Sequence, residues 1–361
     1  MTSYGHALAD DSPFAQFEPC RLRRPQSVRK IAQSPSAGVD PLNVVPESSA
    51  DAQLISALER RLGRVYSRQR LGIEREHEAR IFGQGINFFH PENWYASHSL
   101  IAALLKASGL YWRGQRNAES VRIKRNRIES ARLPSAFHGF QILHLSDLHA
   151  DTNERAMANV AELVSGLTYD VCVLTGDYRG QTSGPYDKSL RCLEPVRRNL
   201  RGNIYGVLGN HDSIMMVPGM EELGIRMLIN EAVRLDRDGA RIHMVGIDDA
   251  HYFRVDNIEK AANDVPADEF SILLSHTPEV YRQAAHADFD VMLTGHTHGG
   301  QICLPGSIPI TLDSVLPRYM ASGAWRYRKM QGYTSVGAGT SIVPVRFNCF
   351  PEITLHELNV G

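Results

Sequence analysis

Six short apolar runs, separated by segments long enough to cross over a sheet, constrain the fold of this chain most strongly. They cover residues 140–145, 170–174, 204–208, 242–247, 270–274 and 290–293, and alternation over 333–338 and 353–358 adds further strands. Runs of this length are typical of strands that lie buried between helices. The pattern therefore predicts an α/β domain.

Polar side chains follow five of these runs at the point where each strand is expected to end. In chain order they are Asp147 and His149, Asp177, Asn210 and His211, His276, and then His296 and His298. In α/β folds, ligands collect at the carboxyl ends of strands. Any one of these residues could form a turn or a helix cap, but five such strand ends in succession are hard to explain that way.

The chemical types of these side chains indicate what they bind. Carboxylate, amide oxygen and imidazole, without thiolate, suit divalent Mn, Fe or Zn rather than Ca. The set is too large for one ion and about enough for two. Two metal ions about 3.5–4 Å apart are the usual machinery of phosphoester displacement.

As a set, these motifs resemble those of the calcineurin-like metallophosphoesterase family over residues 120–361. The matching segments, in the order of the family, are Asp147-x-His149, Gly176-Asp177, Gly209-Asn210-His211-Asp212, His276 and Gly295-His296-x-His298. Residues 295–302 and 351–353 further resemble the bacterial YkuE/YaeI-like phosphodiesterase branch. The resemblance implies a four-layer α/β/β/α sandwich, preceded here by an N-terminal helical extension.

The resemblance also implies a role for each motif residue. Asp147, His149 and His298 would hold one metal ion, Asn210, His276 and His296 the other, and Asp177 would bridge both. The metals would lower the pKa of a shared water from about 15.7 toward 7, which supplies a hydroxide nucleophile. His211 is not a ligand in this scheme; it would stabilise phosphoryl charge or protonate the leaving oxygen.

One position departs from the family pattern. Many members continue the second motif as G-D-x-x-D, with a last carboxylate that orients the catalytic histidine, whereas this chain has Gly180. Either Asp212, Asp248 or Asp249 replaces that carboxylate, or His211 works with less constraint. Arg179 is either a fork donor to substrate phosphate or a surface arginine, and Asp249 is a further candidate for the substrate cleft.

The charge distribution divides the chain into a basic front and an acidic body. Residues 1–132 carry 20 Lys and Arg against 13 Asp and Glu, and the remaining residues carry 19 against 27. We predict a disordered Pro- and Ser-rich basic tail over 1–50, a helical extension over 51–118 and the metallophosphoesterase domain over 119–361. The basic cluster lacks interleaved aromatic residues, so we predict no nucleic-acid partner.

The extension is compatible with two interpretations. Leu54, Leu58, Leu62 and Val65 recur at helical spacing, and a second helical stretch covers 95–110, with basic and aromatic residues nearby. The extension is either an interfacial membrane anchor or, as we favour, a set of helices that pack on the main domain or on a partner subunit. Five cysteines without a C-x-x-C pair, and no signal peptide or transmembrane segment, predict a cytoplasmic protein, with peripheral contact to the inner membrane face as a hypothesis.

The combined interpretation is a dinuclear-metal phosphohydrolase that cleaves a phosphodiester or pyrophosphate bond. A small-molecule, lipid-linked or nucleotide-linked substrate would fit, and within the resembled branch such substrates occur. Two alternatives stay open. One is a non-catalytic scaffold with this fold, and the other is a phosphomonoesterase or phosphoprotein phosphatase.

Overall fold

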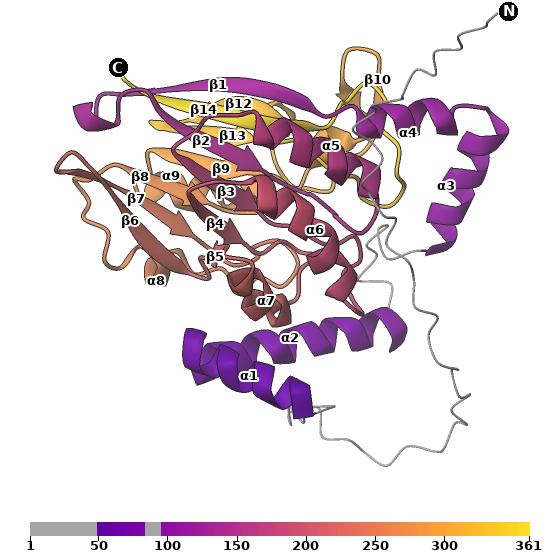
Figure 1. The fold of residues 1–361 in the computed structure, drawn as a ribbon, viewed down its shortest axis with the longest axis horizontal. Coiled ribbons are helices and arrows are strands. Elements are labelled where there is room, and N and C mark those ends of the chain that lie inside the picture. Colours follow the sequence, from indigo (N-terminus) through magenta and orange to yellow (C-terminus); the bar gives the residue numbers. More distant parts are fainter. Residues whose placement is uncertain (1–48, 84–94) are drawn as a thin grey trace, which may run out of the picture. The chain divides into compact units, whose positions relative to one another are not determined.

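Two six-stranded sheets form the centre of the structure (Figure 1), a computed structural model that describes residues 49–83 and 95–361. The first sheet has the strand order β1 (Arg122–Ser130), β14 (Glu352–Val360), β2 (Phe140–Leu145), β3 (Val171–Thr175), β4 (Asn203–Val207) and β5 (Arg226–Met227). The second has the order β12 (Gly323–Tyr327), β13 (Met330–Thr334), β9 (Val291–Thr294), β8 (Ser271–Leu274), β7 (Ala240–Gly246) and β6 (Glu231–Arg237). The tail predicted over 1–50 lies outside the described residues up to position 48.

Parallel strands carry the functional loops in both sheets. In the first sheet β2, β3, β4 and β5 run parallel, and β14 joins them antiparallel to β2. In the second sheet β7, β8, β9 and β13 run parallel, with β6 and β12 as antiparallel edges. Because the carboxyl ends of parallel neighbours meet at one edge, each sheet delivers successive loops to a common place.

Helices cover the outer faces of the two sheets. The α-helices of the described residues are α1 (Ser49–Leu62), α2 (Arg64–Gly83), α3 (Tyr95–Ala107), α4 (Tyr111–Glu119), α5 (Glu154–Ser165), α6 (Asp187–Asn199), α7 (Val217–Glu222), α8 (Ile258–Ala262) and α9 (Tyr281–His286). One apolar cluster joins the two sheets, with Val173 and Leu293 among its members. A second packs α5 and α6 on the first sheet, and a third packs α9 on the second sheet. These layers confirm the predicted α/β/β/α sandwich.

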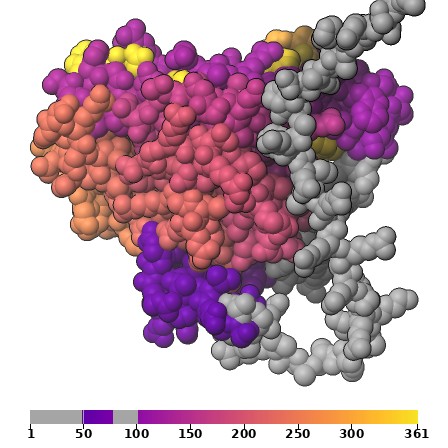
Figure 2. All heavy atoms as spheres, viewed as in Figure 1, coloured from indigo at the N-terminus to yellow at the C-terminus, as the bar shows by residue number. Residues whose placement is uncertain are grey.

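The first two helices belong to the same core as the first sheet. Leu58, Leu62 and Leu71 are buried in the cluster that contains α5 and α6, and Figure 2 shows the indigo atoms of this segment against the orange and rose atoms of the body. The prediction that Val65 continues the apolar stripe is wrong, because Gly63, at φ +90°, separates α1 from α2 and leaves Val65 75% exposed. No helix in the described ranges is long and apolar enough to cross a membrane.

Candidate metal centre

All eight residues predicted as ligands or catalytic histidine meet at the carboxyl ends of five strands. Asp147 and His149 follow β2, Asp177 follows β3, Asn210 and His211 follow β4, His276 follows β8, and His296 and His298 follow β9. Each of them is buried. The loops of the first sheet supply the carboxylates and the amide, whereas the loops of the second sheet supply only imidazoles.

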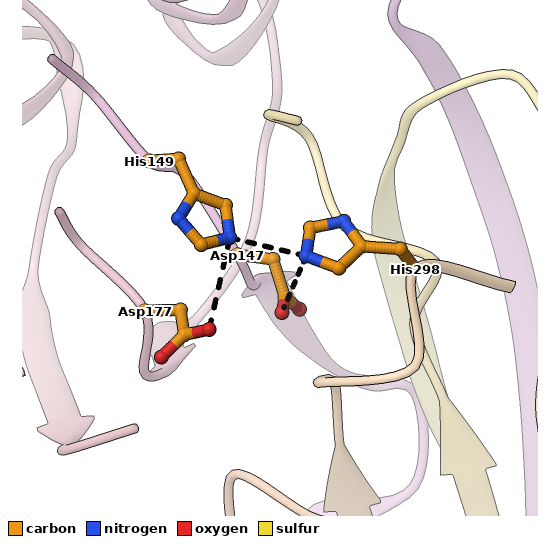
Figure 3. A group of neighbouring side chains, drawn as sticks. All are labelled: Asp147, His149, Asp177 and His298. Atoms are coloured by element: carbon orange, nitrogen blue, oxygen red, sulfur yellow. Dashed lines mark hydrogen bonds and ion pairs between the residues drawn. The ribbon is translucent and has the colours of Figure 1, made fainter. Parts of the chain in front are cut away.

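Asp147, His149, Asp177 and His298 form a compact group (Figure 3). His149 Nε2 lies 3.0 Å from His298 Nε2 and 3.7 Å from Asp177 Oδ2. His298 Nε2 lies 3.5 Å from Asp147 Oδ1. One potential ligand atom from each residue falls within 4.8 Å of the others. A single cation could therefore contact all four side chains.

A second group shares Asp177 with the first. Asn210 Oδ1 lies 2.9 Å from His276 Nε2 and 2.9 Å from His296 Nδ1. His276 Nε2 is also 3.3 Å from Asp177 Oδ2, the same oxygen that faces His149. Asp177 therefore stands between the two groups, as a bridging carboxylate must.

Backbone carbonyls fix the orientation of three of these histidines. His149 Nδ1 donates to Arg179 O at 2.8 Å, His276 Nδ1 to Thr175 O at 2.7 Å, and His296 Nε2 to Asp313 O at 2.7 Å. Because a neutral imidazole carries one N–H, each of the three rings in its neutral form would direct a bare lone pair inward, toward other nitrogen or oxygen acceptors. Such an arrangement is repulsive without positive charge at its centre, so the donor set fits divalent cations.

The pKa values of the site residues also indicate that the centre is stabilised by positive charge. Burial alone would lower the pKa of His276, but the Asp177 carboxylate raises it to about 10. Burial opposes ionisation of Asp177, yet His276 and His211 hold its pKa well below the usual range. Burial and the neighbouring His149 keep the pKa of His298 far below its ordinary value. A proton on His276 thus compensates the carboxylate where a metal ion would do so.

Five of these residues adopt the left-handed backbone region that side chains with a Cβ rarely occupy. The φ angles are +49° at Asp147, +38° at His149, +58° at Asp177, +71° at His296 and +49° at His298. Such conformations cost about 1–2 kcal/mol each for non-glycine residues. Their concentration in one site indicates that the surrounding structure enforces a functional geometry.

Two glycines of the motifs are required by close approach. A Cβ at Gly209 would lie 2.2 Å from Asp177 Oδ1, and a Cβ at Gly295 would lie 1.8 Å from Ser146 Oγ. Both neighbours are held in hydrogen bonds and cannot move aside cheaply. Gly209 therefore lets the loops after β3 and β4 touch within the first sheet, and Gly295 lets the loop after β9 touch the loop after β2 across the two sheets.

His211 lies at the edge of the centre. Its Nε2 is 3.9 Å from Asp177 Oδ2, and its ring centroid is 5.0 Å from that of His149. The His211 backbone N–H donates to Asp177 Oδ1 at 2.9 Å. This places the imidazole beside the two groups without making it part of either.

The carboxylates proposed to replace the one missing at Gly180 are engaged elsewhere, which contradicts that hypothesis. Asp212 accepts the backbone N–H groups of Asp177, Tyr178 and Gly209 at 2.7–2.9 Å, and so connects the loops after β3 and β4. The carboxylate of Asp248 binds α2, as described below. At Gly180 itself, a Cβ would lie 2.3 Å from Thr152 Cγ2, so an aspartate there would require the Thr152 side chain to move.

The two predicted substrate contacts, Arg179 and Asp249, form hydrogen bonds with backbone groups in this structure. Arg179 directs its guanidinium away from the centre, toward the carbonyl oxygens of His211, Thr182 and Gly184. Asp249 accepts the backbone N–H groups of residues 251–253 and so closes its own loop. Both side chains shape loops around the centre, a role that their sequence context does not distinguish from ligand binding.

Sequence reasoning missed two groups of supporting residues. Arg346 is fully buried and donates to the carbonyl oxygens of Val336 and Gly339 at 2.6 and 2.7 Å, beneath the loop of His298. No local motif marks it. Ser146 and Thr175 directly precede the motifs and lie behind the ligands. Their positions in the sequence, next to Asp147 and Gly176, could have identified them as supporting residues.

Fold, loops and donor set together define a metal-dependent phosphoesterase. Residues 140–300 match the family model of the calcineurin-like phosphoesterases, so the chain contains a domain of this kind, which hydrolyses phosphate esters. This confirms the family and the enzyme class predicted from the motifs.

Several bacterial relatives extend the similarity beyond the matched segment. The chain is 27% identical to the metallophosphoesterase YkoQ of Bacillus subtilis, over 72% of this chain and 98% of the relative. It is 28% identical to YkuE of the same organism, over 72% and 93%. It is 26% identical to the phosphodiesterase YaeI of Escherichia coli, over 61% and 82%. These matches are consistent with the predicted YkuE/YaeI-like branch.

Proposed function

We propose that this enzyme is a two-metal hydrolase that cleaves a phosphodiester or pyrophosphate bond. Asp147, His149 and His298 would hold one divalent ion, Asn210, His276 and His296 the other, and Asp177 would bridge them. The observation that carries the assignment is the position of Asp177 Oδ2, which faces His276 Nε2 at 3.3 Å and His149 Nε2 at 3.7 Å. Mn, Fe and Zn all suit this mixture of oxygen and nitrogen donors.

Each part of the site has a separate task in the proposed reaction. Two divalent ions at these positions would lower the pKa of water and neutralise phosphoryl charge. The chain itself orients the imidazoles through Arg179 O, Thr175 O and Asp313 O. His211 would donate a hydrogen bond or a proton to a phosphoryl or leaving-group oxygen, for which an imidazole is suited.

A comparison of two chromogenic substrates tests the proposed reaction. Metal-stripped protein should hydrolyse neither bis-p-nitrophenyl phosphate nor p-nitrophenyl phosphate, and added Mn²⁺ should restore turnover with a preference for the diester. Asp177→Asn should abolish this turnover, whereas the exposed-surface control Asp236→Asn should retain it. Preference for the monoester would overturn the diester assignment in favour of a phosphomonoesterase, and metal binding without turnover of either compound would favour the scaffold alternative.

An amphiphilic, lipid-linked substrate is the finer part of the proposal. The segment after His298 contains β10 (Cys303–Leu304) and β11 (Ile308–Pro309). It exposes five large apolar side chains, each 50–91% accessible: Leu304, Ile308, Ile310, Val315 and Tyr319. The same segment supplies Asp313 O to His296. Clustered exposed apolar side chains mark interaction surfaces, and this one adjoins the candidate metal centre.

Vesicle binding tests the lipid hypothesis and the peripheral contact with the inner membrane face. The full chain should sediment with anionic phospholipid vesicles, and a double variant Ile308→Ser/Ile310→Ser should bind them less. A detergent-dispersed lipid pyrophosphate should be a better substrate than bis-p-nitrophenyl phosphate. If the chain neither binds such vesicles nor gains activity, the lipid-linked substrate and the membrane contact are both wrong.

We also propose the division of the chain into a helical extension over 51–118 and a catalytic domain over 119–361, in a cytoplasmic protein. The burial of Leu58, Leu62 and Leu71 in the common core supports the view that the extension packs on the domain. Limited proteolysis that removes the residues before 119 tests the division. The fragment that begins at residue 119 should expose this apolar surface and lose solubility.

A further inference from the structure

A row of hydrogen-bonded side chains crosses the first sheet and ends on Asp147. In order, it contains Asn126 on β1, His356 on β14, His144 on β2, Thr175 at the end of β3, and Ser146. The successive distances are 3.0 Å, 3.2 Å, 2.8 Å and 2.7 Å, and the last bond, from Ser146 Oγ to Asp147 Oδ2, measures 2.6 Å. All members except Asn126 are buried. The candidate metal centre is thus connected to the far edge of the sheet.

The carboxylate at one end determines the direction of every bond near it. An ionised Asp147 can only accept, so the Ser146 hydroxyl donates to it. The single hydroxyl hydrogen of Ser146 is then committed, and Thr175 donates to Ser146 Oγ. Thr175 in turn must accept from His144, which therefore carries its hydrogen on Nε2.

The same reasoning fixes the proton of the second histidine. Burial lowers the pKa of His144 to about 3, and burial together with His144 holds the pKa of His356 well below its usual value. Both rings are therefore neutral. His144 Nδ1, without a hydrogen, accepts from Nε2–H of His356, and Nδ1 of His356 accepts from the Asn126 amide.

Hydrogen bonds among these side chains do not by themselves explain why polar residues occupy buried positions in the sheet. Neighbouring inward positions of the sheet, such as Ile142, Val173 and Leu358, are apolar and pack against the second sheet. Well-packed apolar residues in place of a buried polar network are often neutral or stabilising. A network that ends on one oxygen of a candidate ligand, while the other oxygen faces His298 at 3.5 Å, has a more specific use.

We propose that His356, His144, Thr175 and Ser146 are positioning residues that hold Asp147 Oδ2 and so direct Oδ1 to the first metal ion. In this arrangement both histidines are neutral Nε2–H tautomers. The positioning role rests on the proposed metal sites, whereas the tautomers do not. Thr175 acts twice, because its carbonyl oxygen also accepts from His276 Nδ1 at 2.7 Å.

Nuclear magnetic resonance of the metal-free protein tests the proton arrangement directly. Long-range ¹H–¹⁵N correlation of ¹⁵N-histidine-labelled protein distinguishes the two neutral tautomers and the charged ring, and His144→Gln and His356→Phe assign the signals. We expect two neutral Nε2–H tautomers at pH 7, where Asp147, whose pKa burial raises to about 6, is ionised. An Nδ1–H tautomer or a charged ring at either position would overturn the directed row, whatever metal binding shows.

Metal titration of paired variants tests the positioning role. Thr175→Val removes the hydroxyl, whereas Thr175→Ser keeps it. His144→Asn removes the N–H that donates to Thr175, whereas the longer side chain of His144→Gln keeps an N–H where Nε2 of the histidine lies. Calorimetry with Mn²⁺ should show Thr175→Val and His144→Asn weakening one of two binding events about 10–100-fold, as loss of supporting hydrogen bonds does elsewhere. Thr175→Ser and His144→Gln should bind like the wild type.

Controls separate positioning from stability and from the proposed function. Circular dichroism and thermal melts should show each variant folded, and His243→Gln, in the second sheet, should leave both Mn²⁺ affinities unchanged. Equal affinities for the two members of each pair would refute the positioning role even though metal binds. A wild-type protein that binds no Mn²⁺ would instead refute the proposed metal sites and the positioning role, while the resonance experiment would still decide the tautomers.

Discussion

The two sheets contribute unlike chemistry to one site. The first sheet supplies Asp147, Asp177 and Asn210, with the single imidazole of His149, from the loops after β2, β3 and β4. The second sheet supplies imidazoles alone, after β8 and β9. Oxygen ligands attract cations by charge, whereas neutral imidazoles complete the coordination without adding charge. Neither sheet could hold two metal ions by itself, so the centre depends on the packing between them.

The loop after β7 breaks the symmetry between the sheets. Like the loops of the first sheet it carries carboxylates, here Asp248 and Asp249. Asp248, however, accepts a hydrogen bond from Arg70 of α2 at 3.1 Å and also binds Tyr66. Arg70 is fully buried, lies 3.7 Å from the Phe253 ring centroid and pairs with Glu74. The difference shows that a strand-end carboxylate can serve the attachment of a helix instead of a metal site.

Removing one ligand from each sheet should have the largest effect. Asp147→Ala and His298→Ala both remove a donor to the same proposed ion, and each should lower kcat/KM for bis-p-nitrophenyl phosphate by about 10²–10⁴, corresponding to several kcal/mol of lost charge stabilisation. Metal analysis of the purified variants should find one ion fewer per chain. Retention of both ions in His298→Ala would show that the second sheet is not needed for that site.

Breaking the attachment of α2 should rank next. Arg70→Met leaves the buried Asp248 carboxylate without its cationic partner, so the free energy of unfolding should fall by about 3–5 kcal/mol. Adding Asp248→Asn should recover part of the loss. Urea denaturation measures both, with Arg68→Met as the matched control, since Arg68 is 57% exposed and pairs only at the surface. A loss below about 1 kcal/mol would contradict a structural role for the β7 loop.

Metal should stabilise the packing of the two sheets. At a free Mn²⁺ concentration 100-fold above the dissociation constant, each site should add about 2.7 kcal/mol to the free energy of unfolding. Thermal melts of metal-stripped protein with and without Mn²⁺ measure this, and a chelator should reverse it. Asp177→Asn, which removes the bridging carboxylate, should show much less stabilisation; an equal increase in that variant would place the stabilising ion elsewhere.

Acid sensitivity should arise in the first sheet and have the smallest effect. Burial lowers the pKa of His144 to about 3, below the unfolded value of about 6.5. The unfolded chain therefore binds the extra proton first, and the stabilising contribution, complete above pH 6.5, is lost as pH falls toward 3. Between pH 7 and 5 this loss is about 2 kcal/mol for one such group.

His144→Phe should remove that part of the pH dependence. Urea denaturation at pH 7 and pH 5 should give a difference about 2 kcal/mol smaller in the variant than in the wild type. His286→Gln, at an exposed position on α9, should leave the difference unchanged. An unaltered pH dependence in His144→Phe would show that the ring is not held neutral in the folded protein.

The sequence sufficed for features in which local pattern and chemistry coincide. Buried strands are short apolar runs, and ligands follow them directly, so the positions of Asp147, Asp177 and His276 at strand ends could be predicted. The resemblance to a known family supplied the sandwich and the pairing of ligands with metal ions. The structure brings every predicted ligand into the centre, although the metal assignments themselves stay predictions.

Features that depend on long-range packing could not be predicted. The side chain of His356 is buried because β14 lies between β1 and β2, and that strand order does not follow from the local sequence. Arg179 was interpreted as a fork donor to substrate phosphate or a surface arginine, and Asp249 as a candidate for the cleft. Only the fold shows that both side chains form hydrogen bonds with backbone groups. The burial of Arg70 and Arg346 could not be predicted, because carbonyl and carboxylate groups to which they donate hydrogen bonds are distant in the sequence.

The left-handed backbone of the ligand residues has a consequence for protein engineering. Glycine would relieve the conformational strain at Asp147, His149, Asp177, His296 and His298, so a selection for heat resistance alone should favour loss of the side chains that chemistry needs. Libraries screened only for melting temperature would then accumulate stable but inactive variants, which is the usual form of a trade-off between stability and activity. Conversely, a scan for non-glycine residues with positive φ at strand ends would locate this centre without knowledge of any ligand.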